Sequence, residues 1–205
     1  MKKNYFILTF LLTGLLVNAQ VDLSNLSFGV KAGANMSSIL ADFESSPVYS
    51  FHAGGYFEAE ITEGVIIRPE LLYSSEGFNA ETYDYELDSK IESEVKLNYL
   101  SLVMVFKYEI SEGFGFEGGG TFSYLLSGKQ TDKSNTTTYS VDIEDEIRKI
   151  DVALTGGLYY EFETGLNFSL RYSYGILSVY KSTDDYTTDF DTKRGLLQFS
   201  VGYTL

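Results

Sequence analysis

Apolar and polar residues alternate with a period of two through most of the chain. In the segment 26–37, Phe28, Val30 and Ala32 share one face while Gly29 and Lys31 share the other. This alternation is typical of strands and not of helices. It predicts eight strands, at residues 26–37, 48–61, 65–76, 97–110, 114–128, 148–162, 166–177 and 194–205. Each has at least the roughly 9–11 residues that a tilted strand needs to cross a bilayer.

The connections between these strands alternate between short and long. Three tripeptides, Thr62-Glu63-Gly64, Ser111-Glu112-Gly113 and Glu163-Thr164-Gly165, make the short ones, and the others are long, polar and acidic. Outer-membrane barrels have short periplasmic turns and longer extracellular loops. The sequence therefore predicts an all-β fold, an eight-stranded antiparallel up-and-down transmembrane β-barrel. An even number of strands places both mature termini in the periplasm.

A cleavable signal peptide is predicted at residues 1–19. Lys2 and Lys3 form its charged start, residues 5–17 its apolar run, and Val17-Asn18-Ala19 the small-residue cleavage site before Gln20. The apolar run is shorter than the roughly 20 residues of a spanning helix. Residues 20–205 then form the outer-membrane β-barrel domain.

The volume of the side chains predicts which face of the strands points outward. A soluble lipocalin-like barrel would turn the apolar set inward, but an eight-stranded barrel is just wide enough for side chains to fill or to hold one small ligand. Several Phe, Tyr and Leu per strand would overfill it. Turning the polar set outward in a membrane would also expose Lys31, Arg68 and Arg171, at about 2–4 kcal/mol for each cation near the midplane. The apolar set is therefore predicted to face lipid.

Aromatic residues on the apolar face are predicted to form two rims at the membrane–water interfaces. The periplasmic rim comprises Phe28, Phe57, Tyr108, Phe114, Phe116, Tyr160, Phe162, Phe168 and Tyr203. The outer rim comprises Phe51, Tyr73, Tyr124, Tyr172 and Tyr174.

The inward faces carry charges of both signs, which must pair because an unpaired buried charge is very costly. The predicted polar network of the lumen comprises Lys31, His52, Glu58, Arg68, Glu70, Glu117, Asp151 and Arg171. Glu60, Lys107 and Glu161 are expected near the periplasmic mouth, in contact with water. The network is interpreted as a salt-bridged plug, and a polar throat for ions or small solutes is the alternative.

Candidate chemistry is sparse. His52 is the only histidine and stands in no nucleophile motif. With Glu58 on the same face, it is interpreted as a satisfied residue of the lumen, so no catalysis and no cofactor are predicted. The formal charge of −14, which becomes −16 without Lys2 and Lys3, argues against nucleic acid or anionic lipid headgroups as partners, and the absence of Cys excludes disulfides. The long connections carry acids that lack the spacing of a calcium loop but could bridge divalent cations to lipid phosphates. They are Glu81, Asp84, Glu86, Asp88, Asp142, Glu144, Asp145, Glu146, Asp184, Asp185, Asp189 and Asp191.

Four short segments together resemble the PorT-like outer-membrane β-barrel family over essentially the whole mature chain. They are Arg68-Pro69-Glu70-Leu71-Leu72-Tyr73-Ser74, Leu97-Asn98-Tyr99-Leu100-Ser101-Leu102, Asp151-Val152-Ala153-Leu154-Thr155-Gly156-Gly157 and Arg171-Tyr172-Ser173-Tyr174-Gly175. Ser101 and Val103 depart from the family pattern, in which an acidic residue and a proline are common. The resemblance implies an outer-membrane location more firmly than a task. Pro69 lacks a ladder donor, so a bulge or a locally weak pairing is expected there.

These patterns predict an integral outer-membrane protein with a structural or interaction role that presents acidic extracellular loops. Two alternatives are a narrow pore and an accessory barrel of a protein secretion system. The expected partners are outer-membrane lipid, divalent cations at the acidic loops, and secretion or envelope proteins. The barrel itself is expected to be a monomer.

Overall fold

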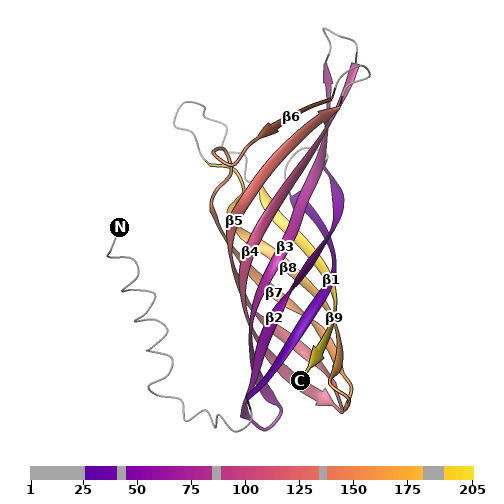
Figure 1. Cartoon of the computed structure of the whole chain (residues 1–205), viewed down its shortest axis with the longest axis vertical. Coiled ribbons are helices and arrows are strands. Elements are labelled where there is room, and N and C mark those ends of the chain that lie inside the picture. The colour runs from indigo at the N-terminus through magenta and orange to yellow at the C-terminus, as the bar shows by residue number, and fades with distance from the viewer. Residues whose placement is uncertain (1–25, 41–44, 85–88, 134–137, 182–191) are drawn as a thin grey trace, which may run out of the picture.

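The computed structural model describes residues 26–40, 45–84, 89–133, 138–181 and 192–205, so the predicted signal peptide lies outside the described residues. The described residues form nine strands (Figure 1). They are β1 (Leu26–Leu40), β2 (Ser45–Thr62), β3 (Val65–Asp84), β4 (Ser89–Ser111), β5 (Phe114–Lys133), β6 (Thr138–Asp142), β7 (Ile150–Glu161), β8 (Leu166–Ser178) and β9 (Lys193–Thr204). No helix in these ranges is long and apolar enough to cross a membrane.

Eight of the strands close into a ring. All neighbouring pairs are antiparallel, in the order β1-β2-β3-β4-β5-β7-β8-β9, and β9 pairs with β1 to close the ring. β6 stands outside the ring and pairs, within the described chain, with the outer part of β5. The predicted eight-stranded up-and-down barrel is therefore confirmed.

The three predicted tripeptides make the short turns, all at one end of the barrel, which we call the turn end. The glycines Gly64, Gly113 and Gly165 have φ of 76°, 71° and 85°, a left-handed conformation that favours glycine. In the first two turns a glutamate four residues earlier accepts the glycine N–H, Glu60 at 3.4 Å and Glu109 at 3.2 Å. β1 begins and β9 ends at the turn end (Figure 1), and the longer connections lie at the opposite, loop end.

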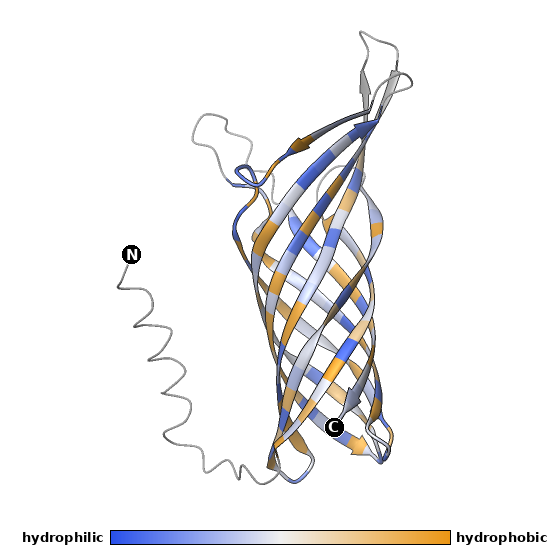
Figure 2. Ribbon diagram, in the orientation of Figure 1, coloured by the Kyte–Doolittle hydropathy of each residue, from blue (hydrophilic) through white to orange (hydrophobic). Residues whose placement is uncertain are grey.

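Apolar side chains cover the outer wall and polar side chains fill the inside. Phe122, Leu170 and Phe199 are 46–50% exposed, whereas Lys31 and Arg171 are 4% and 1% exposed. The alternation is visible as orange and pale or blue bands along each strand (Figure 2). At the turn end the rings of Phe28 and Phe57 meet edge to face at 4.9 Å. The outer wall therefore has the apolar surface of a membrane-spanning barrel.

Several strands run further at the loop end than the alternation predicts, and β3, β4 and β5 do so by the most. The β3–β4 ladder continues to the pair Asp84 and Ser89, through a segment expected to be a loop. β5 reaches Lys133 and is joined there by β6. Residues 77–84, 89–97, 128–133 and 138–142 thus form a sheet that projects beyond the ring, which we call the platform (Figure 1).

Pro69 causes a local interruption of pairing. The β2–β3 pairing includes Tyr56 with Glu70 and Ala59 with Ile67 in one register, but the residues between them are not paired. On its other side Pro69 pairs with Met104 in an unbroken ladder. The locally weak pairing expected at this proline is found, without a bulge.

Candidate functional site

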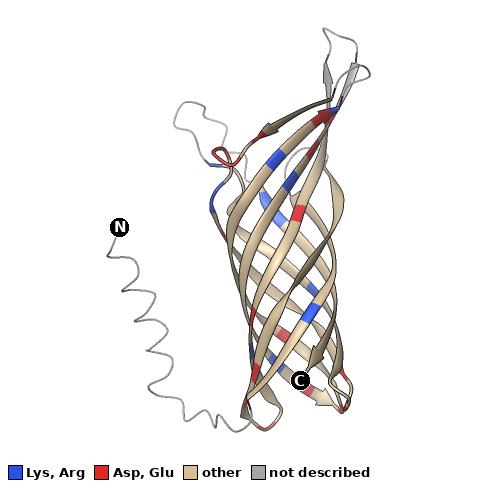
Figure 3. Cartoon of the chain, in the orientation of Figure 1, with Lys and Arg blue, Asp and Glu red and all other residues tan. Residues whose placement is uncertain are grey.

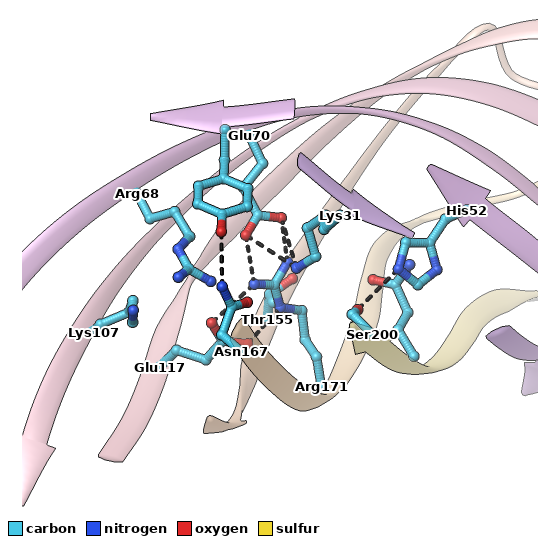
Figure 4. Close-up of polar contacts among 12 residues, drawn as sticks. Lys31, His52, Arg68, Glu70, Lys107, Glu117, Thr155, Asn167, Arg171 and Ser200 are labelled. Carbon is cyan, nitrogen blue, oxygen red and sulfur yellow. Dashed lines mark hydrogen bonds and ion pairs between the residues drawn. The ribbon is translucent and has the colours of Figure 1, made fainter. Parts of the chain in front are cut away.

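The lumen is the part of the barrel where charged side chains converge. The structure places all the residues of the predicted polar network inside it, each no more than 7% exposed. These residues are Lys31, His52, Glu58, Arg68, Glu70, Glu117, Asp151 and Arg171. They do not form one cluster but lie at successive levels along the barrel axis, most of them shown in Figure 4.

The central layer is built around Arg171. Its guanidinium donates to both carboxylate oxygens of Glu70, at 2.8 and 2.9 Å, and to both of Glu117, at 2.8 and 2.9 Å (Figure 4). The ammonium of Lys31 donates to the same oxygens of Glu70 at 3.2 and 3.3 Å. Two cations thus face two carboxylates, and the guanidinium makes the paired contacts that its planar fork favours. The layer joins β1, β3, β5 and β8 across the bore.

The turn-end layer combines four charges nearer the short turns. Glu58 accepts from the Nε of Arg68 at 2.7 Å and from the Nζ of Lys107 at 2.7 Å. Lys107 also donates to Glu161 at 2.7 Å, and Arg68 lies 3.5 Å from that carboxylate. Lys107 is fully buried and Glu161 is partly exposed, so only the acid remains in contact with water. Glu60, also expected at this mouth, is exposed and binds its own turn.

Two tyrosines of the lumen lie over glycines on neighbouring strands. Tyr56 stands opposite Gly29 and Tyr159 opposite Gly115. A Cβ at Gly29 would lie 2.1 Å from the ring of Tyr56, and one at Gly115 would lie 2.7 Å from that of Tyr159. The guanidinium of Arg68 sits 4.3 Å from the Tyr56 ring centre, and the lysine of the turn-end layer sits 4.2 Å from that of Tyr159. The glycines therefore admit the rings that cover these cations.

A neutral layer surrounds His52. Its Nδ1 lies 2.7 Å from the Asn35 Oδ1 and its Nε2 lies 2.9 Å from the Ser200 Oγ. The order serine–histidine–asparagine is that of a nucleophile triad. All three residues are almost fully buried, however, and Gln198 donates to the same Asn35 oxygen at 3.0 Å. The arrangement satisfies a buried histidine, with partners from β1 and β9 and not with Glu58.

The loop-end layer contains two residues that the sequence reasoning did not assign. Arg194 forms ion pairs with Glu76 and with Asp151, the latter at 2.7 Å, and lies over the Tyr99 ring at 5.7 Å. Ser74 donates to Glu76 at 2.8 Å. Glu76 and Arg194 stand at the ends of the predicted strands. The period-two pattern, followed to the last residue of each predicted strand, already places both in the lumen.

An apolar cap closes the loop end. Ile143 and Ile147, from the turn after β6, are buried against side chains that line the mouth of the barrel. The Ile147 N–H donates to the Ile143 carbonyl at 3.2 Å, so both side chains come from one helical turn. The other members of the cap are Ile39, Phe78, Ala80, Val95, Leu97, Tyr99, Leu125, Val179 and Tyr180.

Between the layers the lumen has little free space. A cavity of about 10 Å³ lies among Leu72, Ser101 and Leu196, room for about one water molecule. Hydrogen-bonded hydroxyls line the neighbouring wall, where Thr155 contacts Thr121 at 2.9 Å and Ser173 at 2.8 Å. At each of these layers, side chains of the described residues therefore occupy the bore.

The described residues contain no group of three or more His, Cys, Asp or Glu that could hold a metal ion. Of the acids considered as calcium ligands, Asp142, Asp145 and Glu146 are exposed and Glu144 is half-buried and paired with Lys149 at 2.9 Å. The side chains of Glu81 and Asp84 are not described. Glu86, Asp88, Asp184, Asp185, Asp189 and Asp191 lie outside the described residues.

Comparison with known proteins agrees with this architecture. Residues 18–181 match the family described as outer membrane protein beta-barrel domain. Among solved structures, the attachment invasion locus protein Ail of Yersinia pestis is 15% identical, with a TM-score of 0.50 over 87% of this chain and 98% of that one. Neisserial surface protein A is 10% identical, with a TM-score of 0.50 over 86% and 96%. No curated protein matches the sequence. The chain belongs to the outer membrane protein β-barrel domain family, integral barrels of the bacterial outer membrane.

Proposed function

We propose that the protein is a closed, non-catalytic barrel that anchors an interaction surface on the outer face of the outer membrane. The observation that carries this proposal is the filled lumen: three ionic layers, a neutral layer and an apolar cap succeed one another along the axis. A barrel without an open bore can bind partners on its surface but cannot conduct ions or solutes. The projecting platform offers such a surface.

A narrow pore is the main alternative, and single-channel recording in a planar bilayer separates the two. Five cations and six carboxylates pair within the layers, so an ion entering the bore would have to break those contacts. We expect no stable openings from protein whose folding is verified by a mobility difference between unboiled and boiled samples. Reproducible unitary conductance would overturn the closed-barrel proposal.

We further propose that the turn end and both mature termini face the periplasm and that the platform faces outward. The support is the length of the connections, because outer-membrane barrels keep short turns on the periplasmic side. The chain has no cysteine, so single cysteines can report orientation. In intact cells an impermeant maleimide should label Tyr139→Cys, on exposed β6, but should label Glu112→Cys only after permeabilisation. The reverse result would invert the topology.

β6 supports an interaction role because, among the described residues, one of its edges has no paired strand. Within the described chain it pairs with β5 alone, and Tyr139 and Val141 are 64% and 38% exposed. An unpaired strand edge can accept a further strand from a partner. The similar Ail is an attachment invasion locus protein, and an attachment role here would use this platform. Divalent cations at the exposed acids around Asp145 are a further proposed partner.

The PorT-like resemblance supports a narrower alternative, an accessory barrel of a protein secretion system. Co-purification of defined secretion or envelope proteins in a native detergent extract would support it. A clean monomer in that extract would count against it.

A further inference from the structure

Two lysines face each other on the outer wall at the base of the platform. Lys96 on β4 is directly opposite Lys129 on β5 in the antiparallel register. Both are exposed, and blue bands lie close together on the upper parts of β4 and β5 (Figure 3). Directly opposite residues of an antiparallel pair have Cβ atoms about 4.5–5.5 Å apart, and like charges placed so are destabilising. The repulsion makes an anion between the two ammonium groups favourable.

The pair lies just above the apolar band of the barrel. Leu100 on β4 and Leu126 on β5, which are 41% and 45% exposed, are the last apolar side chains of the outer wall before the pair. Lys96 lies four residues before Leu100 in the sequence, on the side of the loop end. At about 3.4 Å per residue and a strand tilt of about 40°, Lys96 is about 10 Å further along the barrel axis toward the loop end. Asn98 donates to Ser127 at 2.9 Å in the interval. Lysine stems can bend toward the apolar surface, which brings the ammonium groups to the level of lipid headgroups.

The charges around the pair leave it unevenly neutralised. Glu94 accepts from Lys96 at 2.9 Å and lies 3.8 Å from Lys133. Lys129 stands opposite Asp142 of β6, but the structure shows no ion pair between them. On the side of β3, Lys96 faces Gly77, which has no side chain to cover it. Lys133 stands opposite Glu92, so three lysines and three carboxylates (Glu92, Glu94 and Asp142) lie on this face of a protein whose formal charge is −14.

We propose that Lys96 and Lys129 bind a phosphate group of an outer-leaflet lipid against the outer wall of β4 and β5. Lysine ammonium groups bind phosphate as point charges, and two of them match an anion that carries more than one negative charge. The lipid is favoured as the source of the phosphate because the apolar wall directly below is the surface against which its acyl chains would pack. The inference rests on the proposed outward orientation of the platform. It names Lys96 and Lys129 as the residues that contact outer-membrane lipid, one of the expected partners.

The test compares lipid retention by the purified, refolded barrel in native mass spectrometry with EDTA present. The probes are diphosphoryl lipid A and the same lipid after removal of its phosphates. K96Q/K129Q should bind diphosphoryl lipid A about 30-fold more weakly than the unmodified barrel, from the contribution of two lysines at a charged lipid surface. The matched control is K133Q, on the same face of β5 but about 14 Å further along the strand, and it should change binding less than threefold.

Four outcomes would overturn the proposal. Two concern the variants: K96Q/K129Q retains as much diphosphoryl lipid A as the unmodified barrel, or K133Q loses as much lipid as K96Q/K129Q. Two concern the ligand: the phosphate-free lipid binds as well as diphosphoryl lipid A, or lipid is retained only when Mg²⁺ replaces EDTA, which would assign the contact to carboxylates bridged by the cation. Displacement of lipid A by an equal concentration of inorganic phosphate would exclude the lipid as the source. Folding is checked by the unboiled gel mobility. Failure here would leave the conductance and maleimide results unchanged, so it is distinguishable from failure of the proposed function.

Discussion

The ion pairs of the central layer lead to a quantitative prediction for Arg171 and Glu117. Replacing Arg171 by Gln removes four charge-assisted hydrogen bonds and leaves Glu117 buried without a cation. Removing one partner of such a buried pair costs about 3–5 kcal/mol of unfolding free energy. Glu117→Gln leaves Arg171 paired with Glu70 and should cost about 1.5–3 kcal/mol, the range for hydrogen bonds to charged groups.

The double variant R171Q/E117Q restores charge balance, because Lys31 and Glu70 remain as a pair at 3.2 Å. If the two effects were independent, the double variant would lose about 4.5–8 kcal/mol. We expect about 2–4 kcal/mol instead, which corresponds to a favourable coupling between Arg171 and Glu117. Its stability should therefore be no lower than that of R171Q alone.

The assay is reversible urea unfolding of the barrel in phospholipid vesicles, with the folded fraction read from unboiled gel mobility. A gel readout suits this chain because it contains no tryptophan. Additive losses, with the double variant less stable than the unmodified barrel by the sum of the two single losses, would refute the coupling. That result would mean that the layer fills space but does not pair charge.

Three further predictions concern packing and access. Gly33→Ala should lower the unfolding free energy by about 1–3 kcal/mol in the same urea assay, because the new Cβ would lie 2.0 Å from the Phe199 carbonyl oxygen. The control Gly118→Ala, whose Cβ would have its nearest contact at 3.9 Å, should change the unfolding free energy by less than about 0.5 kcal/mol. Ile147→Ser should loosen the apolar cap and speed proteolysis near residues 143–149 without producing conductance, since the ionic layers below stay closed; unitary openings in a planar bilayer would contradict this. A fluorophosphonate probe should not label Ser200 in the folded barrel, because the hydroxyl is enclosed in the lumen; labelling detected by mass spectrometry would reopen a catalytic role.

The membrane-spanning part of the fold could be predicted because one requirement, an apolar outer wall, imposes the period-two pattern. The predicted strand from 166 to 177 and the observed β8 (Leu166–Ser178) differ by one residue. Beyond the bilayer that requirement ends. β6 is exposed at every position, so it has no buried face that could leave an alternating pattern in the sequence. The outer parts of β3 to β5 likewise join a platform that the pattern does not reveal.

The candidate site could be predicted as a set of inward charges but not as layers. Which charges meet depends on strand register, and the alternation leaves the register between strands open. Arg171 meets Glu70 across the bore, from strands that are not neighbours. His52 likewise finds Asn35 and Ser200 and not Glu58, because β1 and β9 bring them to its level. Glu76 and Arg194 share the inward face of the predicted strands 65–76 and 194–205, but as terminal residues they were not assigned to the network.

The same alternation that inserts the barrel also closes it. A register slip of one residue would turn the charged side chains of a strand toward lipid, where each Arg or Lys near the midplane costs about 2–4 kcal/mol. The same slip would turn the aromatic side chains of that strand into a bore with little free space. Arg171, held by four hydrogen bonds from β8 to β3 and β5, makes such a slip still less favourable. The lumen residues are thus constrained by both packing and charge. In the function proposed above, recognition uses surfaces free of that constraint, which are the platform and the lysine pair at its base.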